Sequence, residues 1–214
     1  MSRHFTNPIR GRFNAWILHF AGNADHKTHG KWKQQIFEDL PDSFVELGPG
    51  TGGNFRYYRQ GSLLTAIEPN RMMLDRLRKK AEQHGINLDI LESGAEKLDL
   101  ADESVEAVVS TQVLCTVGDL NQVLKEVYRV LRPGGRFLFL EHIAAPKGTF
   151  LRRFQDLSLV HQPWRWFFEG CNLNCQIDSA LETAGFSKVE LEHYKLKSLL
   201  PVPIRHYIAG IATK

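Results

Sequence analysis

A glycine-rich segment is the part of the sequence whose residue types and spacing point most directly to chemistry. Residues 46–54 read ELGPGTGGN, and they follow a short apolar run. Glycine lets a backbone turn tightly and lets a ligand approach without meeting a Cβ atom. A strand before such a loop and a helix after it form the usual context of a nucleotide-binding site. Gly53 lies three positions after Gly50, so a dinucleotide G-x-G-x-x-G interpretation stays open, as does an ordinary strand-to-helix turn.

An acidic residue stands where a nucleotide-binding site needs one. Glu68 lies 20 positions after Gly48 and directly follows the apolar run 63–67. A carboxylate there can accept hydrogen bonds from both ribose hydroxyls of an adenosyl cofactor. The alternative is a carboxylate near a helix start, which the helix dipole favours. The tripeptide 94–96, Gly-Ala-Glu, follows the next apolar run.

Glu141 and His142 end the fifth apolar run, at the sheet edge where α/β proteins place their ligands. We interpret both as candidate catalytic residues, with His142 as the first candidate for a base or an orienting group. The alternative for His142 is a partly buried side chain bonded to the backbone.

The chain has three cysteines, too few and too odd in number for a disulfide framework. We expect Cys115 to be a small packing residue. Cys171 and Cys175 have C-x-x-x-C spacing without a second pair, so we expect no metal site. The cysteine content favours a reducing, cytoplasmic location.

Short apolar runs alternate with helical patterns from residue 43 onward, which predicts an α/β fold with a mostly parallel sheet and helices on both faces. The pattern 120–131 has the 3.6-residue period of an amphipathic helix, and Pro133 ends it. The expected strands are 44–47, 63–67, 88–91, 105–110 and 136–141, with closing strands at 187–194 and 206–213; the other expected helices are 53–58, 71–84 and 176–185.

The remaining segments predict a helical cap or lid over residues 1–42 and a domain over 43–214 with an insertion at about 144–175. Within the cap we expect helices at 12–20 and 31–40, with a solvated turn at 26–31 between them. The insertion carries Trp164, Trp166, Phe167 and Phe168 among basic residues. We expect most of these rings to pack onto the sheet; contact with a membrane surface, helped by Arg152 and Arg153, is the alternative.

The composition excludes several classes of protein. The 214 residues include 43% hydrophobic and 24% charged residues, and the formal charge is +3. These values are typical of a globular protein and give no concentrated basic face, so we expect no nucleic-acid partner. The most apolar early stretch, 13–21, is far shorter than the about 20 residues that cross a bilayer.

The ordered motifs resemble those of the class I S-adenosylmethionine-dependent methyltransferases. The resemblance covers residues 43–142 and implies a Rossmann-like fold with a seven-stranded sheet whose last strand is antiparallel. It implies S-adenosylmethionine as the cofactor. The resemblance assigns cofactor binding to the glycine loop, to the ribose-binding acid with its neighbours beside the adenine, to the Ala-Glu pair at the adenine ring, and to the wall near the methionine moiety. These residues are Glu46, Gly48, Gly50 and Asn54; Glu68, Pro69 and Asn70; Ala95 and Glu96; and Gln112 and Val113.

Further segments are similar to the animal methyltransferase-like proteins that methylate alkyl thiols at membranes, which belong to the methyltransferase domain 11 type. The segments are 46–55, 113–117, 131–135, 141–142 and 169–173. Pro49 departs from that group, and its hydrophobic N-terminal anchor has no counterpart in residues 1–26. The resemblance implies a small-molecule acceptor with at most peripheral membrane contact.

The acceptor itself stays open between a thiol and a quinone or lipid head group. An adenine-methylating enzyme would carry Asn/Asp-Pro-Pro-Tyr/Phe after the fourth strand, where this chain reads STQVLC at 110–115. A nicotinamide-dependent oxidoreductase and a non-catalytic adenosyl-binding module are the alternatives from other classes.

Overall fold

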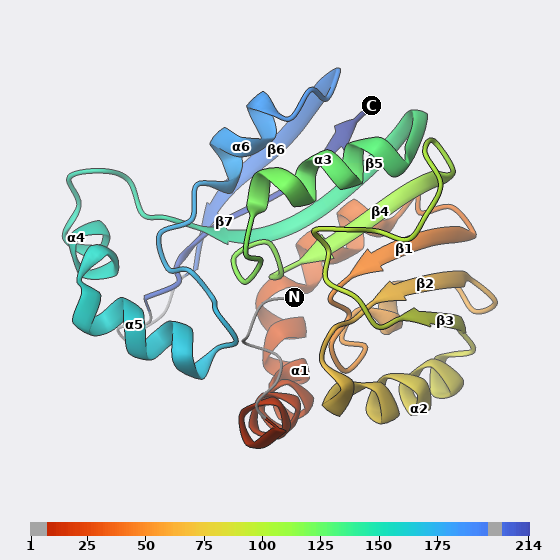
Figure 1. Ribbon diagram of the computed structural model, residues 1–214, viewed down its shortest axis with the longest axis horizontal. Coiled ribbons are helices and arrows are strands. Elements are labelled where there is room, and N and C mark those ends of the chain that lie inside the picture. The colour runs from red at the N-terminus through yellow and green to blue at the C-terminus, as the bar shows by residue number, and fades with distance from the viewer. Residues whose placement is uncertain (1–7, 197–202) are drawn as a thin grey trace.

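The computed structural model describes residues 8–196 and 203–214, and the side chains of 8–10 and 13–24 lie outside that description. Seven strands form one sheet in the order β3-β2-β1-β4-β5-β7-β6 (Figure 1). Strands β1 to β5 pair in parallel, and β7 pairs antiparallel with β5 and with β6. The predicted fold class and the antiparallel last strand are confirmed. The strands are β1 Ser43–Leu47, β2 Leu63–Ile67, β3 Asn87–Leu91, β4 Val105–Thr111, β5 Leu131–Ile143, β6 Lys188–Lys195 and β7 His206–Thr213.

Helices cover both faces of the sheet, as expected. Two apolar cores result: one lies under α3 and α6, and the other lies under α1 and α2. Helix α3 begins where the Asp119 side chain accepts a hydrogen bond from the Gln122 amide (3.0 Å), and α2 ends at Gly85 with a left-handed φ of 65°. The helices are α1 Pro8–Phe37, α2 Leu74–His84, α3 Leu120–Val130, α4 Phe150–Asp156, α5 Ser158–Phe167 and α6 Ile177–Thr183; η2 Phe55–Tyr57 and η3 Arg71–Met73 are single 3-10 turns.

The N-terminal region differs from the expectation of two helices and a solvated turn. Helix α1 is one continuous helix of 30 residues. The segment 26–31 lies inside it, and His29 is only 3% exposed because its Nδ1 bonds the Tyr194 hydroxyl (2.8 Å). Contacts of this kind with strands distant in sequence stabilise a helix that has no amphipathic pattern of its own.

The insertion also corrects an expectation. It forms α4 and α5, and these short helices stand away from the sheet at the left of Figure 1. Most of its aromatic rings are exposed instead of being buried on the sheet: Trp166, Phe167 and Phe168 are 57%, 46% and 36% exposed. Trp164 alone of the four is not exposed.

Two further boundaries differ. Strand β5 continues to Ile143. Glu141 and His142 therefore lie within the strand and pair with β7, and they do not end it. The expected helix 53–58 is only the 3-10 turn η2. Among the described residues, no helix has both the length and the apolar character needed to cross a membrane.

Candidate active site

The carboxyl ends of the parallel strands bring the sequence-predicted residues to one edge of the sheet. In Figure 1 the strands run from right to left, toward α1 and the insertion. Strand β1 is central, and the chain reverses its direction of travel across the sheet there, since β2 and β4 flank it. This is the topological switch point at which open α/β sheets bind ligands.

The glycine loop begins where β1 ends. Gly48, Gly50 and Gly52 have left-handed φ values of 55°, 59° and 78°. A Cβ atom on Gly48 would lie 2.7 Å from the Val113 side chain, so the loop after β1 and the loop after β4 touch at this point. Glycine is required there by the backbone conformation and by the close approach.

Glu68 follows β2 and supports the same loop. Its Oε2 accepts a hydrogen bond from the Gly50 amide (2.9 Å), and its Oε1 accepts one from the Asn70 amide (2.8 Å). Burial raises the pKa of Glu68 to about 7, and the two amide hydrogen bonds oppose that shift. Pro69 lies half-buried between the two.

Glu46 and Asn54 form a second buried pair on β1 and the loop. Asn54 Nδ2 donates to Glu46 Oε1 (2.6 Å) and to Thr111 Oγ1 (2.9 Å). Glu46 Oε2 and Asn54 Oδ1 are buried and make no well-aligned hydrogen bond among the described residues, although the buried Tyr58 hydroxyl lies close enough to the Glu46 carboxylate to interact with it. Burial raises the pKa of Glu46 to about 7, while the Asn54 hydrogen bond lowers it. A buried carboxylate oxygen without a partner is costly unless a ligand supplies the missing donor.

The loop after β4 is strained and is tied to α1. Gln112 has a φ of 57°, which is uncommon for a residue other than glycine and concentrates at functional sites. Its Nε2 donates to Asp25 Oδ1 (2.9 Å), and Asp25 Oδ2 pairs with Lys33 Nζ (2.6 Å). Helix α1 is therefore fastened to the loop on which Gln112 and Val113 lie.

Glu141 fixes the same loop by hydrogen bonds. Its Oε1 accepts hydrogen bonds from the Ser110 hydroxyl (2.7 Å) and the Val113 amide (3.1 Å), and its Oε2 accepts one from the Leu114 amide (3.2 Å). Burial raises the pKa of Glu141 to about 7, and these hydrogen bonds oppose the shift. With its side chain fully buried, Glu141 is placed to position the loop.

His142 faces a group that the sequence did not predict. Its Nε2 lies 3.2 Å from Cys171 Sγ, which also accepts a hydrogen bond from Trp164 Nε1 (3.2 Å). Hydrogen bonding from Cys115 and from His142 holds the pKa of the Cys171 thiol well below its usual range. Cys115 is 2% exposed and lies beside this pair.

The Ala-Glu pair after β3 contacts the segment before α3. Ala95 is buried in the core under α3, and Glu96 Oε1 accepts a hydrogen bond from the Gly118 amide (2.8 Å). The pair fixes the loop before α3. Asn70 instead contacts the insertion, because its Nδ2 donates to Glu169 Oε1 (2.7 Å).

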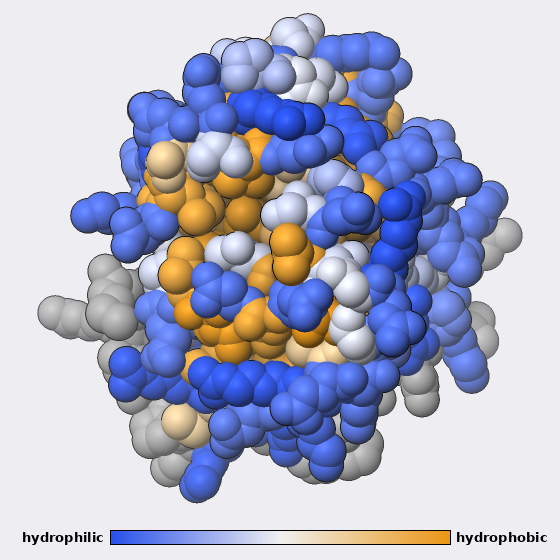
Figure 2. All heavy atoms as spheres, turned by 90° about the vertical axis from the view of Figure 1, so that its right-hand side faces the viewer, coloured by the Kyte–Doolittle hydropathy of each residue, from blue (hydrophilic) through white to orange (hydrophobic). Residues whose placement is uncertain are grey.

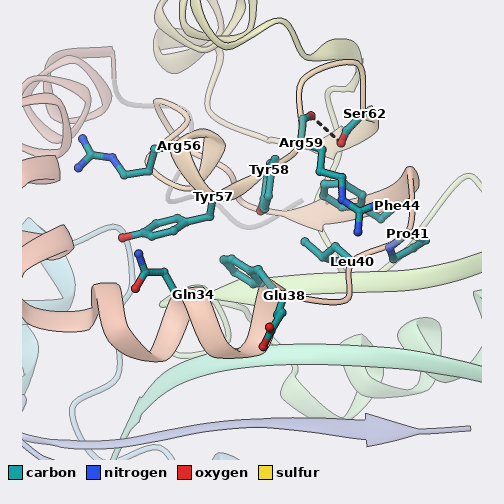
Figure 3. Close-up of a pocket in the computed structure, with 11 residues that line it drawn as sticks. Gln34, Glu38, Leu40, Pro41, Phe44, Arg56, Tyr57, Tyr58, Arg59 and Ser62 are labelled. Carbon is teal, nitrogen blue, oxygen red and sulfur yellow. Dashed lines mark hydrogen bonds between the residues drawn. The ribbon is translucent and has the colours of Figure 1, made fainter.

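Two cavities lie elsewhere in the part of the chain that the structure describes. One of about 280 Å³ lies between the end of α1 and η2, where Tyr57 lies over Gln34 and the Ser62 hydroxyl donates to the Arg59 carbonyl (Figure 3). The other, of about 430 Å³, lies between α2 and β3. Both lie toward the strand beginnings, on the side where Figure 2 shows apolar residues gathered between charged ones. Neither cavity is lined by a predicted cofactor residue.

Comparison with known proteins decides the family. A methyltransferase domain model matches residues 45–139. Human thiol S-methyltransferase TMT1A is 37% identical over 193 residues, covering 85% of this chain and 78% of that protein. Mouse thiol S-methyltransferase TMT1B is 36% identical over 218 residues, covering 97% and 88%. The chain belongs to the class I S-adenosylmethionine-dependent methyltransferases, in the group of the thiol S-methyltransferases.

The fold agrees with that assignment. A crystal structure of a methyltransferase from Thermotoga maritima superposes with a TM-score of 0.64 over 95% of this chain and 98% of that one, at 22% identity. S-adenosylmethionine is accordingly the cofactor, and the nicotinamide alternative is wrong.

The residues present in this methyltransferase fit the cofactor. The unpartnered Glu46 oxygen, the glycine backbone at the switch point and the Glu68 carboxylate at the end of β2 match a cation-bearing amino acid moiety and a ribose. Glu46 would face the positively charged end and Glu68 would hold the ribose hydroxyls.

Sequence reasoning missed several residues of the site. Asp25, His29 and Lys33 are spaced four residues apart, so on one continuous helix they share a face. That spacing would have revealed them if the helix had not been divided. Thr111 carries no comparable signal. Glu169 and Cys171 lie in the segment 169–173, whose resemblance to the thiol-methylating group marked it without giving either residue a role.

Proposed function

We propose that this methyltransferase transfers the methyl group of S-adenosylmethionine to a small-molecule thiol. The observation that carries the proposal is the 37% identity with human thiol S-methyltransferase TMT1A over 78% of that protein. The bound cofactor would supply a methyl group already activated on a sulfonium. The chain's own task is then to align the acceptor and exclude water.

The buried groups are suited to that task. Glu46 and Glu68 hold the two ends of the cofactor, while Glu141 fixes the amides of Val113 and Leu114 beside the reacting end. A thiol with a pKa near 8.5 is partly ionised at neutral pH, so a strong general base is unnecessary. His142, 1% exposed, is the residue we assign to orienting the acceptor.

We further propose that residues 1–42 act as a cap over the site. Helix α1 packs on η3, where a Cβ atom on Gly11 would lie 3.1 Å from the Asn70 side chain. The Asp25–Gln112 hydrogen bond fastens the same helix to the loop after β4. A cofactor between these loops would be shielded from water by α1 on one side and by Glu169 of the insertion on the other.

We propose a cytoplasmic location with peripheral membrane contact through the insertion. Support comes from the three free cysteines and from an aromatic–basic patch, which comprises the exposed residues Phe150, Leu159, Trp166, Phe167 and Arg153. Arg152, the other arginine named from the sequence, is paired with Asp156. Phe150 and Leu159 are 85% and 76% exposed. Exposed aromatic and aliphatic side chains beside arginines suit the surface of an anionic bilayer.

The test is methyl transfer from labelled S-adenosylmethionine to a matched panel: an alkyl thiol, its alcohol analogue, a quinol, an amine and a phospholipid head group. The proposal expects the thiol to react with a kcat/KM at least about 100-fold above the alcohol, since the thiol is both more ionised and more nucleophilic. Glu68→Gln serves as the control that removes cofactor binding. A faster reaction with the quinol or the head group would replace the thiol as the acceptor.

A further inference from the structure

Three soft donor groups meet beneath the acceptor side of the site. Cys115 follows β4, His142 lies near the end of β5, and Cys171 follows α5. Their donor atoms all lie within 4.8 Å of one another, and the residues are 2%, 1% and 6% exposed. We refer to them as the Cys–His–Cys cluster.

Hydrogen bonds around the cluster hold its members in place. The Asn172 amide donates to the Cys115 carbonyl (2.7 Å), which joins the segment carrying Cys171 directly to the loop after β4. Trp164 Nε1 fixes Cys171 Sγ from the side of α5. His142 is fixed by β5, which pairs with β7 along its full length. The donors are thus held close together by the backbone contacts of their segments, by Trp164 and by the contact of His142 with Cys171.

The dimensions of the cluster suit a tetrahedral metal ion. Zn²⁺ binds sulfur at about 2.3 Å and imidazole nitrogen at about 2.0–2.1 Å, so neighbouring ligand atoms lie about 3.5–3.8 Å apart. The distance between His142 Nε2 and Cys171 Sγ is 3.2 Å, and no donor pair exceeds 4.8 Å. Shifts of about 1 Å or less, within side-chain rotation, would complete the geometry.

The chemistry of the donors selects the metal. Two thiolates and one imidazole favour Zn²⁺ over Mg²⁺, Ca²⁺ or Mn²⁺, which prefer oxygen ligands. Cys175 does not complete a closed four-ligand site, because its Sγ donates to the His142 carbonyl (3.4 Å) and it lies outside the group of mutually close donors. Three protein ligands with one open position are typical of catalytic zinc, whereas structural zinc has four.

We propose that the Cys–His–Cys cluster binds one Zn²⁺ whose fourth position takes the sulfur of the acceptor. The second part rests on the proposed thiol acceptor; the first part does not. When Zn²⁺ binds, the S–H bonds of Cys115 and Cys171 break and their protons pass to solvent, while each sulfur keeps the electron pair that forms its bond to zinc. When the acceptor binds, its S–H bond breaks in the same way and its proton passes to solvent. No oxidant or reductant is needed, because every atom keeps its oxidation state.

The position of the cluster in the site agrees with this role. Cys115 lies three residues after Gln112, on the loop that touches the glycine loop through Val113 and Gly48. Glu141, the neighbour of His142, holds the amides of the same loop. A sulfur bound at the cluster would therefore be held next to the loop after β4, which contacts the glycine loop.

The test uses the full chain, purified under reducing conditions, stripped with a chelator and titrated with Co²⁺ as a spectroscopic probe. One Co²⁺ per chain is expected, with thiolate-to-cobalt charge-transfer absorption and the intense d–d bands of tetrahedral coordination, and Zn²⁺ should displace it. Cys171→Ser removes a metal ligand. It is therefore expected to weaken Co²⁺ binding by more than about 100-fold, the upper end of the losses seen when a residue that only supports a ligand is changed. Cys175→Ser is the matched control and should bind Co²⁺ within about threefold of the parent chain.

A second arm tests the open position. Addition of an alkyl thiol should intensify the charge-transfer band, and the corresponding alcohol should not. Calorimetric titration with S-adenosylmethionine, repeated on each variant, shows that the variants are folded. A variant that loses cofactor binding is replaced by the milder His142→Gln, for which the same loss of Co²⁺ affinity is expected.

Each contrary outcome is distinct. The metal site would be overturned if the chain takes up no Co²⁺, or if uptake survives Cys171→Ser. It would also be overturned if Cys115 and Cys171 form a disulfide and the chain still takes up no metal once that disulfide is reduced. Metal binding without a response to thiol would overturn the open position. Thiol methylation without metal would leave the proposed function intact, and metal binding without thiol methylation would remove the function but leave the site.

Discussion

The two halves of the active-site edge are built in different ways. The carboxylates of the cofactor half, at the ends of β1 and β2, bond mainly within residues 46–70: Glu46 bonds Asn54 eight positions later, and Glu68 bonds Gly50 and Asn70. Only the amides of Asn54 and Asn70 reach further, to Thr111 and Glu169. The acceptor half, at the ends of β4 and β5, depends on segments far apart, such as His142 with Cys171 and Gln112 with Asp25. Chemistry that is common to a family can be encoded locally, whereas acceptor recognition is assembled by the whole fold.

The contrast predicts that the cofactor half responds most strongly to single substitutions. Glu68→Ala should weaken S-adenosylmethionine binding by about 100-fold or more, since two hydrogen bonds to a charged group are worth about 1.5–3 kcal/mol each. Calorimetry would measure the change. Glu106→Ala, which removes a half-exposed carboxylate of β4, is the control and should leave affinity unchanged. A loss of less than about tenfold would place the ribose elsewhere.

Cofactor affinity should also rise with pH. Burial raises the pKa values of Glu46 and Glu68 to about 7. Because the native state holds these protons more tightly than the unfolded chain, both groups lower the stability of the free protein as the pH rises from about 4.5 to 7. The cationic cofactor favours the ionised forms, so its binding releases protons and should strengthen by about tenfold per pH unit below 7 for each group that must ionise. Glu46→Gln should reduce the slope; an unchanged slope would show that Glu46 does not titrate with binding.

The cap should show a smaller effect that separates charge from packing. Asp25→Ala leaves the Lys33 ammonium, whose side chain is 3% exposed, without its partner, and should cost about 2–3 kcal/mol of unfolding free energy. Asp25→Ala/Lys33→Met should recover part of that loss, because the buried charge is gone. Thermal unfolding would measure both. If the double variant is no more stable than Asp25→Ala, the ion pair is not the cause.

The same contrast explains what could be predicted from the sequence. The glycine loop and Glu68 follow apolar runs that must be buried strands, so their meeting at one edge follows from a parallel sheet alone. The continuity of α1 could not be predicted, because its stability comes from contacts such as His29 with Tyr194, 165 positions away. The spacing of Cys171 and Cys175 led us to expect no metal site. The groups that lie close to Cys171 are His142 and Cys115, which lie at strand ends that only the sheet brings together. The exposure of Trp166 and Phe167 could not be predicted from the sequence either, because the residue type of an apolar side chain does not show what it will contact.

That exposed region of the acceptor half supports the prediction with the smallest effect on the folded chain. Trp166→Ser/Phe167→Ser removes two rings of the aromatic–basic patch that are 57% and 46% exposed. Surface changes of this kind usually alter stability by about 0.5 kcal/mol or less, so Tm and cofactor affinity should stay near those of the parent chain. Binding to phosphatidylserine–phosphatidylcholine vesicles, measured by co-sedimentation, should nevertheless fall by about 100-fold or more, because each of the two rings contributes roughly 1.5–3 kcal/mol when it leaves water. Leu63→Ser, at the 55% exposed start of β2 on the opposite edge of the sheet, is the matched control. Equal losses of vesicle binding in both variants would mean that the vesicle does not bind this patch specifically. The insertion would then face the acceptor and not a bilayer.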